Sequence, residues 1–291
     1  MNFRSAHEGN VFKKVVAELP GIISKKCDGY DELYGYKLVP DEPNSERKFY
    51  DKEIAECLIY KFCKGYQFHY EIVVEHIVNV LNWRREFNPL SAAFKEVHNK
   101  ELVEVGILAS YPNHESNKKV VTWNIYGQLI KKKYLFKDGE KFLRYRIGLM
   151  ERGLRLLDFK DDTNNYMTQV HDYKGVSVLS MDSDMKKVVR EIVLVFQSYY
   201  PELLYAKYFI NVPSFLRWIY DVIKTFVDEN TKKKFVVLSD GRKMAHYLKD
   251  VPSTNYGGSD TNTLQQENIT NVRPTEYGLY ILEKQANEDI D

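Results

Sequence analysis

The feature that most constrains the fold is an alternation of strand-like and helix-like stretches that begins after Leu90. Short stretches rich in β-branched and aromatic residues alternate with longer amphipathic ones. The predicted strands cover residues 102–112, 119–127, 169–180, 203–213 and 233–240, and the predicted helices cover 128–136, 141–159, 184–200 and 214–227. Because parallel strands need helical crossovers of this length, the pattern predicts an α/β fold with a mainly parallel sheet.

The residues before this alternation predict a helical region. The amphipathic stretch VFKKVVAEL predicts a helix that ends at Pro20 and Gly21 and is followed by a short helical turn around Ile22–Cys27. Residues 36–50 are polar and predict a loop. Apolar side chains at three- and four-residue intervals predict two more helices in 51–87, separated by Gly65-Tyr66-Gln67. After the sheet, residues 252–271 predict a polar loop. We therefore expect a helical N-terminal lobe (1–90), an α/β lobe (91–265) and a tail (266–291) that docks on it as a strand or short helix.

Composition excludes several classes of protein. The 42 basic and 41 acidic residues leave a formal charge of +1, which argues against a protein that wraps nucleic acid. No stretch approaches the ~18 apolar residues of a membrane span, and the N-terminus lacks the apolar core of a signal peptide. The three cysteines form no CxxC pair, so we expect reduced thiols in a cytosolic protein.

The stretch QVHDYKGVSVLS (169–180) places two side chains that can bind a metal on one face of a strand. Alternation directs His171 and Tyr173 to one face, and Asp172 and Lys174 to the other. An imidazole and a phenol can also be ordinary pocket or core groups that hydrogen bonds satisfy. No nucleotide-binding loop, hydrolase or zinc motif accompanies them, so these residues alone leave both interpretations open.

Several stretches resemble the CRAL-TRIO, or Sec-fourteen-like, lipid-transfer family over roughly residues 50–260. LIYKFCKGYQFHYEIVVEHIVNVLNWRREFNPL (58–90) is similar to the family's helical lead-in. YYPELLYAKYFINVPSFLRWIYDVIKTFVDENTKKKFVVL (199–238) and Tyr256-Gly257-Gly258 are similar to its most diagnostic region. With DELYGYKL, QVHDYKGVSV and PTEYGLYIL, the chain more closely resembles one fungal branch, the Sec-fourteen homologue five proteins, described as haem-binding. The resemblance implies a sheet that floors a deep apolar pocket, and a mobile gate helix at about 214–227.

The resemblance to phosphatidylinositol-binding members implies one possible ligand. Those members hold the inositol phosphate with an Arg in the N-terminal lobe, a Glu-Arg pair, and a Thr and a Lys near the gate. This chain matches at Glu202, Thr231 and Lys234, but has Tyr66 and Leu203 in place of the two arginines. Each lost charge-assisted contact is worth ~1.5–3 kcal/mol, so we expect weakened headgroup binding.

The resemblance to the haem-binding branch implies another ligand, haem b. It implies that Tyr173 is the axial ligand of the iron through its phenolate oxygen, and that His171 supports the site. Tyrosinate ligation of haem occurs in catalase, and ferric iron together with nearby cations favours loss of the phenol proton. The implied cofactor-binding side chains are Tyr66, Tyr126, Arg146, His171, Tyr173 and Lys207.

We therefore expect a non-enzymatic haem-binding protein of the cytoplasm, acting in haem or oxidant stress or in phosphoinositide-linked signalling. Its partners would be haem, phosphatidylinositol and, transiently, the endoplasmic reticulum or other membranes, but not nucleic acid. The first alternative is a phosphatidylinositol transfer protein that exchanges lipid between membranes and supports phosphoinositide synthesis. The second is a peroxidase- or catalase-like haem enzyme, which needs an open distal site with acid–base groups.

Overall fold

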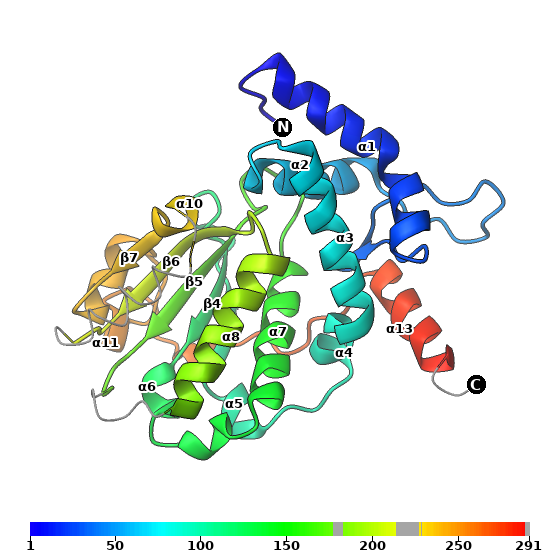
Figure 1. Cartoon of the computed structure of the whole chain (residues 1–291). Helices are drawn as coiled ribbons and strands as arrows, with labels where there is room; N and C mark the ends of the chain where they lie inside the picture. Colours follow the sequence, from blue (N-terminus) through cyan, green and yellow to red (C-terminus); the bar gives the residue numbers. More distant parts are fainter. Residues whose placement is uncertain (177–182, 214–226, 228, 289–291) are drawn as a thin grey trace.

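The computed structural model describes residues 1–176, 183–213, 227 and 229–288, and it joins a helical N-terminal region to a sheet covered by helices (Figure 1). The N-terminal elements are α1 (Ala6–Lys26), β1 (Glu32–Leu33), β2 (Tyr36–Lys37), α2 (Lys52–Gly65), α3 (Tyr70–Phe87) and α4 (Pro89–Phe94). Helix α3 ends at Asn88 in the left-handed region, and the Asn88 side chain caps α4, whose first residue is Pro89.

Two N-terminal predictions were wrong. Helix α1 does not end at Pro20 but continues to Lys26. A proline inside a helix removes one backbone hydrogen bond, and Pro20 is exposed, so water can satisfy the carbonyl that loses its partner. The expected loop at 36–50 begins with β2, which pairs with β1 in an antiparallel hairpin.

The sheet confirms the predicted α/β class. Its strands are β3 (Gly106–Ser110), β4 (Val120–Asn124), β5 (Met167–Asp172), β6 (Leu204–Ile210) and β7 (Phe235–Val237), in the order β3-β4-β5-β6-β7. Strands β3 and β4 are antiparallel, and every other neighbouring pair is parallel.

Strand β5 is shorter than predicted. It ends at Asp172, although the N–H of Tyr173 still donates to the carbonyl of Ile210 at 3.0 Å. Gly175 then turns the chain with a φ of 82°, a conformation that glycine adopts without strain. The predicted strand residues 177–180 lie outside the described residues.

The remaining elements include three short helices that were not predicted, at Lys100–Val103, Glu229–Lys232 and Gly241–His246, and the first of them replaces the start of the strand predicted at 102–112. The remaining elements are α5 (Lys100–Val103), α6 (Tyr126–Leu129), η1 (Lys133–Phe136), α7 (Gly139–Leu154), α8 (Ser183–Tyr199), α10 (Glu229–Lys232), η4 (Gly241–His246), α11 (Ser253–Tyr256), α12 (Leu264–Glu267) and α13 (Glu276–Glu288). The single helix predicted at 128–136 is two short ones, and the loop predicted at 252–271 contains α11 and α12. Except for Val227, the gate helix expected at 214–227 lies outside the described residues.

Helices α7 and α8 lie along one face of the sheet, with α3 and α4 beyond α7 (Figure 1). The tail first follows the sheet edge, where the Ile269 N–H donates to the Leu108 carbonyl at 2.8 Å. Helix α13 then packs against α4 and the β1–β2 hairpin. In the described part of the chain, no helix is long and apolar enough to cross a membrane.

A buried ionic network joins the N-terminal region to α7. Arg84 of α3 donates to Glu32 at 2.8 Å and to Glu151 of α7 at 2.6 Å. Tyr30 donates to Glu32 at 2.8 Å, and Tyr200 donates to Glu151 at 2.7 Å. Because the guanidinium donates to both carboxylates, the network fixes where α7 lies relative to α3.

Candidate ligand-binding site

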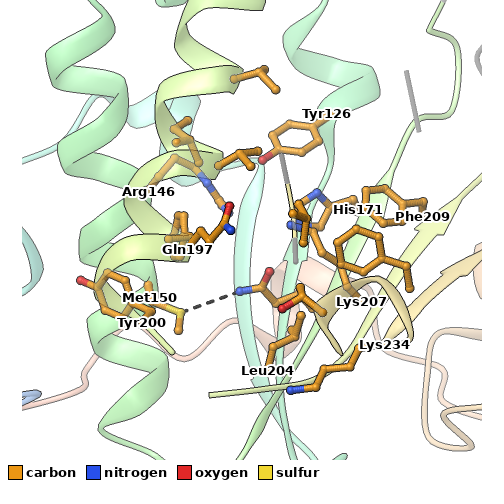
Figure 2. Close-up of a pocket in the computed structure, with 18 of the residues that line it drawn as sticks. Tyr126, Arg146, Met150, His171, Gln197, Tyr200, Leu204, Lys207, Phe209 and Lys234 are labelled. Atoms are coloured by element: carbon orange, nitrogen blue, oxygen red, sulfur yellow. Dashed lines mark hydrogen bonds between the residues drawn. The ribbon is translucent and has the colours of Figure 1, made fainter. Parts of the chain in front are cut away.

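A cavity of about 330 Å³ lies between the sheet and helices α7 and α8 (Figure 2). Its volume is typical of small-molecule and cofactor sites. Most of its wall is apolar and much of that is aromatic: the residues include Ile130, Phe136, Phe142, Met150, Val176, Met185, Val189, Ile192, Val193, Phe196, Phe209 and Phe235. Such a wall suits a large apolar ligand.

Strand register brings the polar residues into this cavity. On β5 and β6, Gln169 pairs with Lys207 and His171 pairs with Phe209, so these four side chains share the face that α7 and α8 cover. Tyr173 keeps the alternation one residue beyond β5 and also lines the cavity. The cavity brings together all nine residues singled out from the sequence: Tyr66, Tyr126, Arg146, His171, Tyr173, Glu202, Lys207, Thr231 and Lys234.

Two cations line the cavity close to His171. Arg146 is 4% exposed and donates to the Asn124 side chain, while its Nε atom is buried without a hydrogen-bond partner. Burial, and then the charge of Arg146, lower the pKa of Lys207 to about 7. Glu202 is the one carboxylate among the described lining residues, and it pairs with Lys64 and Lys234 instead. This end of the cavity therefore presents positive charge without a described counter-ion.

His171 and Tyr173 differ in their protonation. Burial, then Lys207 and Arg146, hold the pKa of His171 well below its usual range, so its imidazole is neutral near pH 7. The buried Nε2 atom of His171 has no hydrogen-bond partner in the described structure. Burial and the neighbouring Tyr126 raise the pKa of Tyr173, against the lowering effect of Arg146, so the phenol keeps its proton.

Tyr126 completes this end of the cavity from α6. Its ring centroid lies 5.1 Å from that of His171 and 5.8 Å from that of Tyr173. The approach depends on Gly127, because a Cβ atom there would lie 1.9 Å from the backbone oxygen of Lys174. Figure 2 shows Tyr126, Arg146 and His171 directed toward the same space.

A second polar group lies where the end of α2 meets the loop before β6. Glu202 forms ion pairs with Lys64 at 3.0 Å and with Lys234 at 3.5 Å, and the backbone N–H of Lys234 donates to the Thr231 carbonyl at 3.0 Å. Tyr66 follows Lys64 by two residues and stacks on His76, with ring centroids 3.8 Å apart. These residues form a mixed-charge site at the cavity wall.

Sequence reasoning missed three residues of this region. Lys64 also donates to the hydroxyl of Tyr166 at 3.0 Å, and Lys61 donates to the Glu202 carbonyl at 3.1 Å. The spacing of Lys61 and Lys64 puts both on one face of α2, but only the fold brings that face to Glu202.

Gln169 is a further lining residue that the sequence did not reveal. Its amide contacts the Met150 sulfur at 3.8 Å, the dashed line in Figure 2.

Among the described residues, no group of three or more His, Cys, Asp and Glu side chains could hold a bare metal ion.

Comparison with known proteins agrees with this fold. The model of the CRAL/TRIO domain matches residues 104–258. The chain is 59% identical to the phosphatidylinositol transfer protein SFH5 of Vanderwaltozyma polyspora and 60% identical to that of Saccharomyces cerevisiae, each over the full length of both chains. A crystal structure of Sfh5 superimposes with a TM-score of 0.96 at 61% identity, covering 99% of this chain and 100% of that one. The chain therefore belongs to the CRAL/TRIO family.

Proposed function

We propose that the cavity binds haem b and that Tyr173 would hold its iron through the phenol oxygen. The proposal rests on one observation: the cations Arg146 and Lys207 both line an aromatic-walled cavity, and no described carboxylate pairs with either of them. The same cavity contains His171 and Tyr173. When bound, haem would supply an iron that accepts side-chain ligands, a flat apolar ring and two carboxylates.

The chain's own residues fit this group in three respects. Aromatic and aliphatic side chains such as Phe142, Phe196 and Phe209 offer the apolar surface that a porphyrin ring needs. Arg146 and Lys207 offer charge-assisted hydrogen bonds to propionates, and the unpartnered Arg146 Nε atom has an unused donor. Two ligand atoms, the Tyr173 phenol oxygen and the unpartnered His171 Nε2, belong to the same cavity.

The two ligand candidates make different demands on protons. His171 is already neutral, so ligation through Nε2 releases no proton near pH 7. Tyr173 must lose its proton to bind iron, and burial opposes that loss, whereas ferric iron and Arg146 favour it. Ligation by Tyr173 therefore predicts that the affinity for ferric haem rises about tenfold per pH unit between about pH 5.5 and 7. Above pH 7, loss of the Lys207 proton counteracts the rise.

Haem titration of variants tests the assignment. Tyr173→Phe should lower the affinity at least tenfold and abolish its rise with pH, whereas His171→Gln should keep that rise. Tyr145→Phe is the control, because Tyr145 is a buried tyrosine of α7 that does not line the cavity. Equal affinity and equal pH dependence in Tyr173→Phe and Tyr145→Phe would remove Tyr173 as ligand.

Phosphatidylinositol exchange between membranes is the second candidate, and the names of the two SFH5 relatives support it directly. The site at Glu202, Thr231 and Lys234 also supports it, because it offers a cation and hydrogen-bonding groups to a phosphorylated headgroup. In a vesicle assay with labelled phosphatidylinositol, Lys234→Ala combined with Thr231→Val should abolish transfer. Tyr173→Phe should retain it, and transfer unchanged in the double variant would contradict this candidate. Either function would have the protein act in the cytosol and contact membranes only peripherally.

A further inference from the structure

Lys207 is an amine held in an apolar cavity without a described anionic partner. Its Nζ atom lies 5.6 Å from the ring centroid of Phe209 and 5.9 Å from that of Phe235. No hydrogen bond or ion pair joins it to another residue of the described structure, and its neighbour Arg146 is also cationic. We propose that Lys207 is a nucleophile that captures long-chain aliphatic aldehydes as an imine inside this cavity.

The protonation of Lys207 supports this role. An ordinary lysine, with a pKa near 10.4, is neutral in only about one molecule in 2,500 at pH 7. Burial and the charge of Arg146 lower the pKa of Lys207 to about 7, which makes roughly half of its amines neutral at that pH. Desolvation and a neighbouring cation are the two devices that activate lysines for carbonyl chemistry in enzymes.

The chemical step balances with groups that line the cavity. The neutral Nζ atom attacks the carbonyl carbon and forms a C–N bond, while the carbonyl oxygen becomes the hydroxyl of a carbinolamine. That hydroxyl leaves as water with the second proton of the amine, so amine and aldehyde give imine and water without an oxidant or reductant. Tyr173 is a protonated phenol in the same cavity and can relay this proton, because it donates one to the leaving hydroxyl and regains one from the nitrogen.

The cavity selects the class of aldehyde. Its wall includes Ile130, Val189, Ile192 and Phe196, which favour an alkyl chain over a sugar or another polar aldehyde. Its volume of about 330 Å³ lies in the range of sites that hold organic ligands, so the cavity has room for an alkyl chain. A fatty aldehyde would place its polar end at Lys207 and bury its tail.

Lys61 provides an internal comparison. Burial lowers its pKa to about 7 as well. However, Lys61 Nζ donates to the Glu202 carbonyl at 3.1 Å and lies 3.3 Å from the ring centroid of Tyr166. It does not line the cavity. If protonation alone governed reactivity, both lysines would react; if the cavity matters, Lys207 alone reacts quickly.

The test treats the full-length protein, prepared without bound haem, with decanal and sodium cyanoborohydride at pH 7, and maps alkylated lysines by peptide mass spectrometry. We expect Lys207 to be modified at least tenfold faster than Lys61, at a rate that levels off above about pH 7. Lys207→Arg, which keeps the charge, should remove that adduct and leave the thermal transition within a few degrees. An unmodified Lys207, or equal modification of Lys61, would overturn the proposal. Neither result bears on haem binding, which the Tyr173→Phe titration tests separately.

Discussion

Replacing Arg84 by Met should destabilise the protein strongly, because two buried carboxylates would lose their shared cation. Arg84 and Glu32 are 0% exposed and Glu151 is 1% exposed. Removing one partner of such a buried network costs about 3–5 kcal/mol. The loss is limited because Glu32 keeps its bond from Tyr30 at 2.8 Å and Glu151 keeps its bond from Tyr200 at 2.7 Å.

The assay is urea unfolding followed by circular dichroism, with Arg85→Met as the matched control. Arg85 pairs with Asp28 at 2.6 Å, but Asp28 is 84% exposed, so we expect a loss below about 1 kcal/mol. Losses that are equal in the two variants would refute the reasoning.

Three further predictions concern the cavity. Glu202→Gln should lower phosphatidylinositol exchange several-fold without changing haem affinity, measured by vesicle transfer and haem titration; equal losses in both would contradict separate sites. Lys207→Met should stabilise the protein by about 2–4 kcal/mol at pH 6, and this gain should disappear toward pH 10. From about pH 7 to 10.4 the folded wild-type protein binds fewer protons at Lys207 than the unfolded protein does, so the wild-type stability rises with pH and the advantage of the variant shrinks. Urea unfolding at both pH values checks this, and a gain independent of pH would contradict it. Gly127→Ala should cost about 1–3 kcal/mol and weaken haem binding, because its Cβ would lie 1.9 Å from the Lys174 oxygen. Gly21→Ala, with nothing within 4 Å, is its control and should not destabilise.

Local patterns were sufficient to predict part of the site. The period of a strand directed His171 and Tyr173 to one face, and both line the cavity even though β5 ends at Asp172. The alternation of strands and helices likewise predicted a mainly parallel sheet. In both cases each strand or helix is indicated by a pattern within its own consecutive residues.

The remaining features depend on contacts that are distant in sequence. Lys64 pairs with Glu202 across 138 positions of the chain, and Arg84 pairs with Glu151 across 67. No local pattern predicts such pairs, because Lys64 and Arg84 each match the pattern of a solvent-exposed residue on an amphipathic helix. The prediction that the first helix ends at Pro20 was wrong for the opposite reason. Proline is a strong local signal for a helix end, but the apolar face of this helix is buried on both sides of Pro20, and that burial stabilises the continuous helix.

Titration of the purified full-length protein with ferric haem, followed by absorption spectroscopy, tests the central claim most directly. We predict a Soret band with saturable, one-to-one binding in the wild-type protein and in Tyr145→Phe, and a shifted or absent band in Tyr173→Phe with the fold intact by circular dichroism. A protein that stays colourless at saturating haem, or a Tyr173→Phe variant with the wild-type spectrum, would contradict the account.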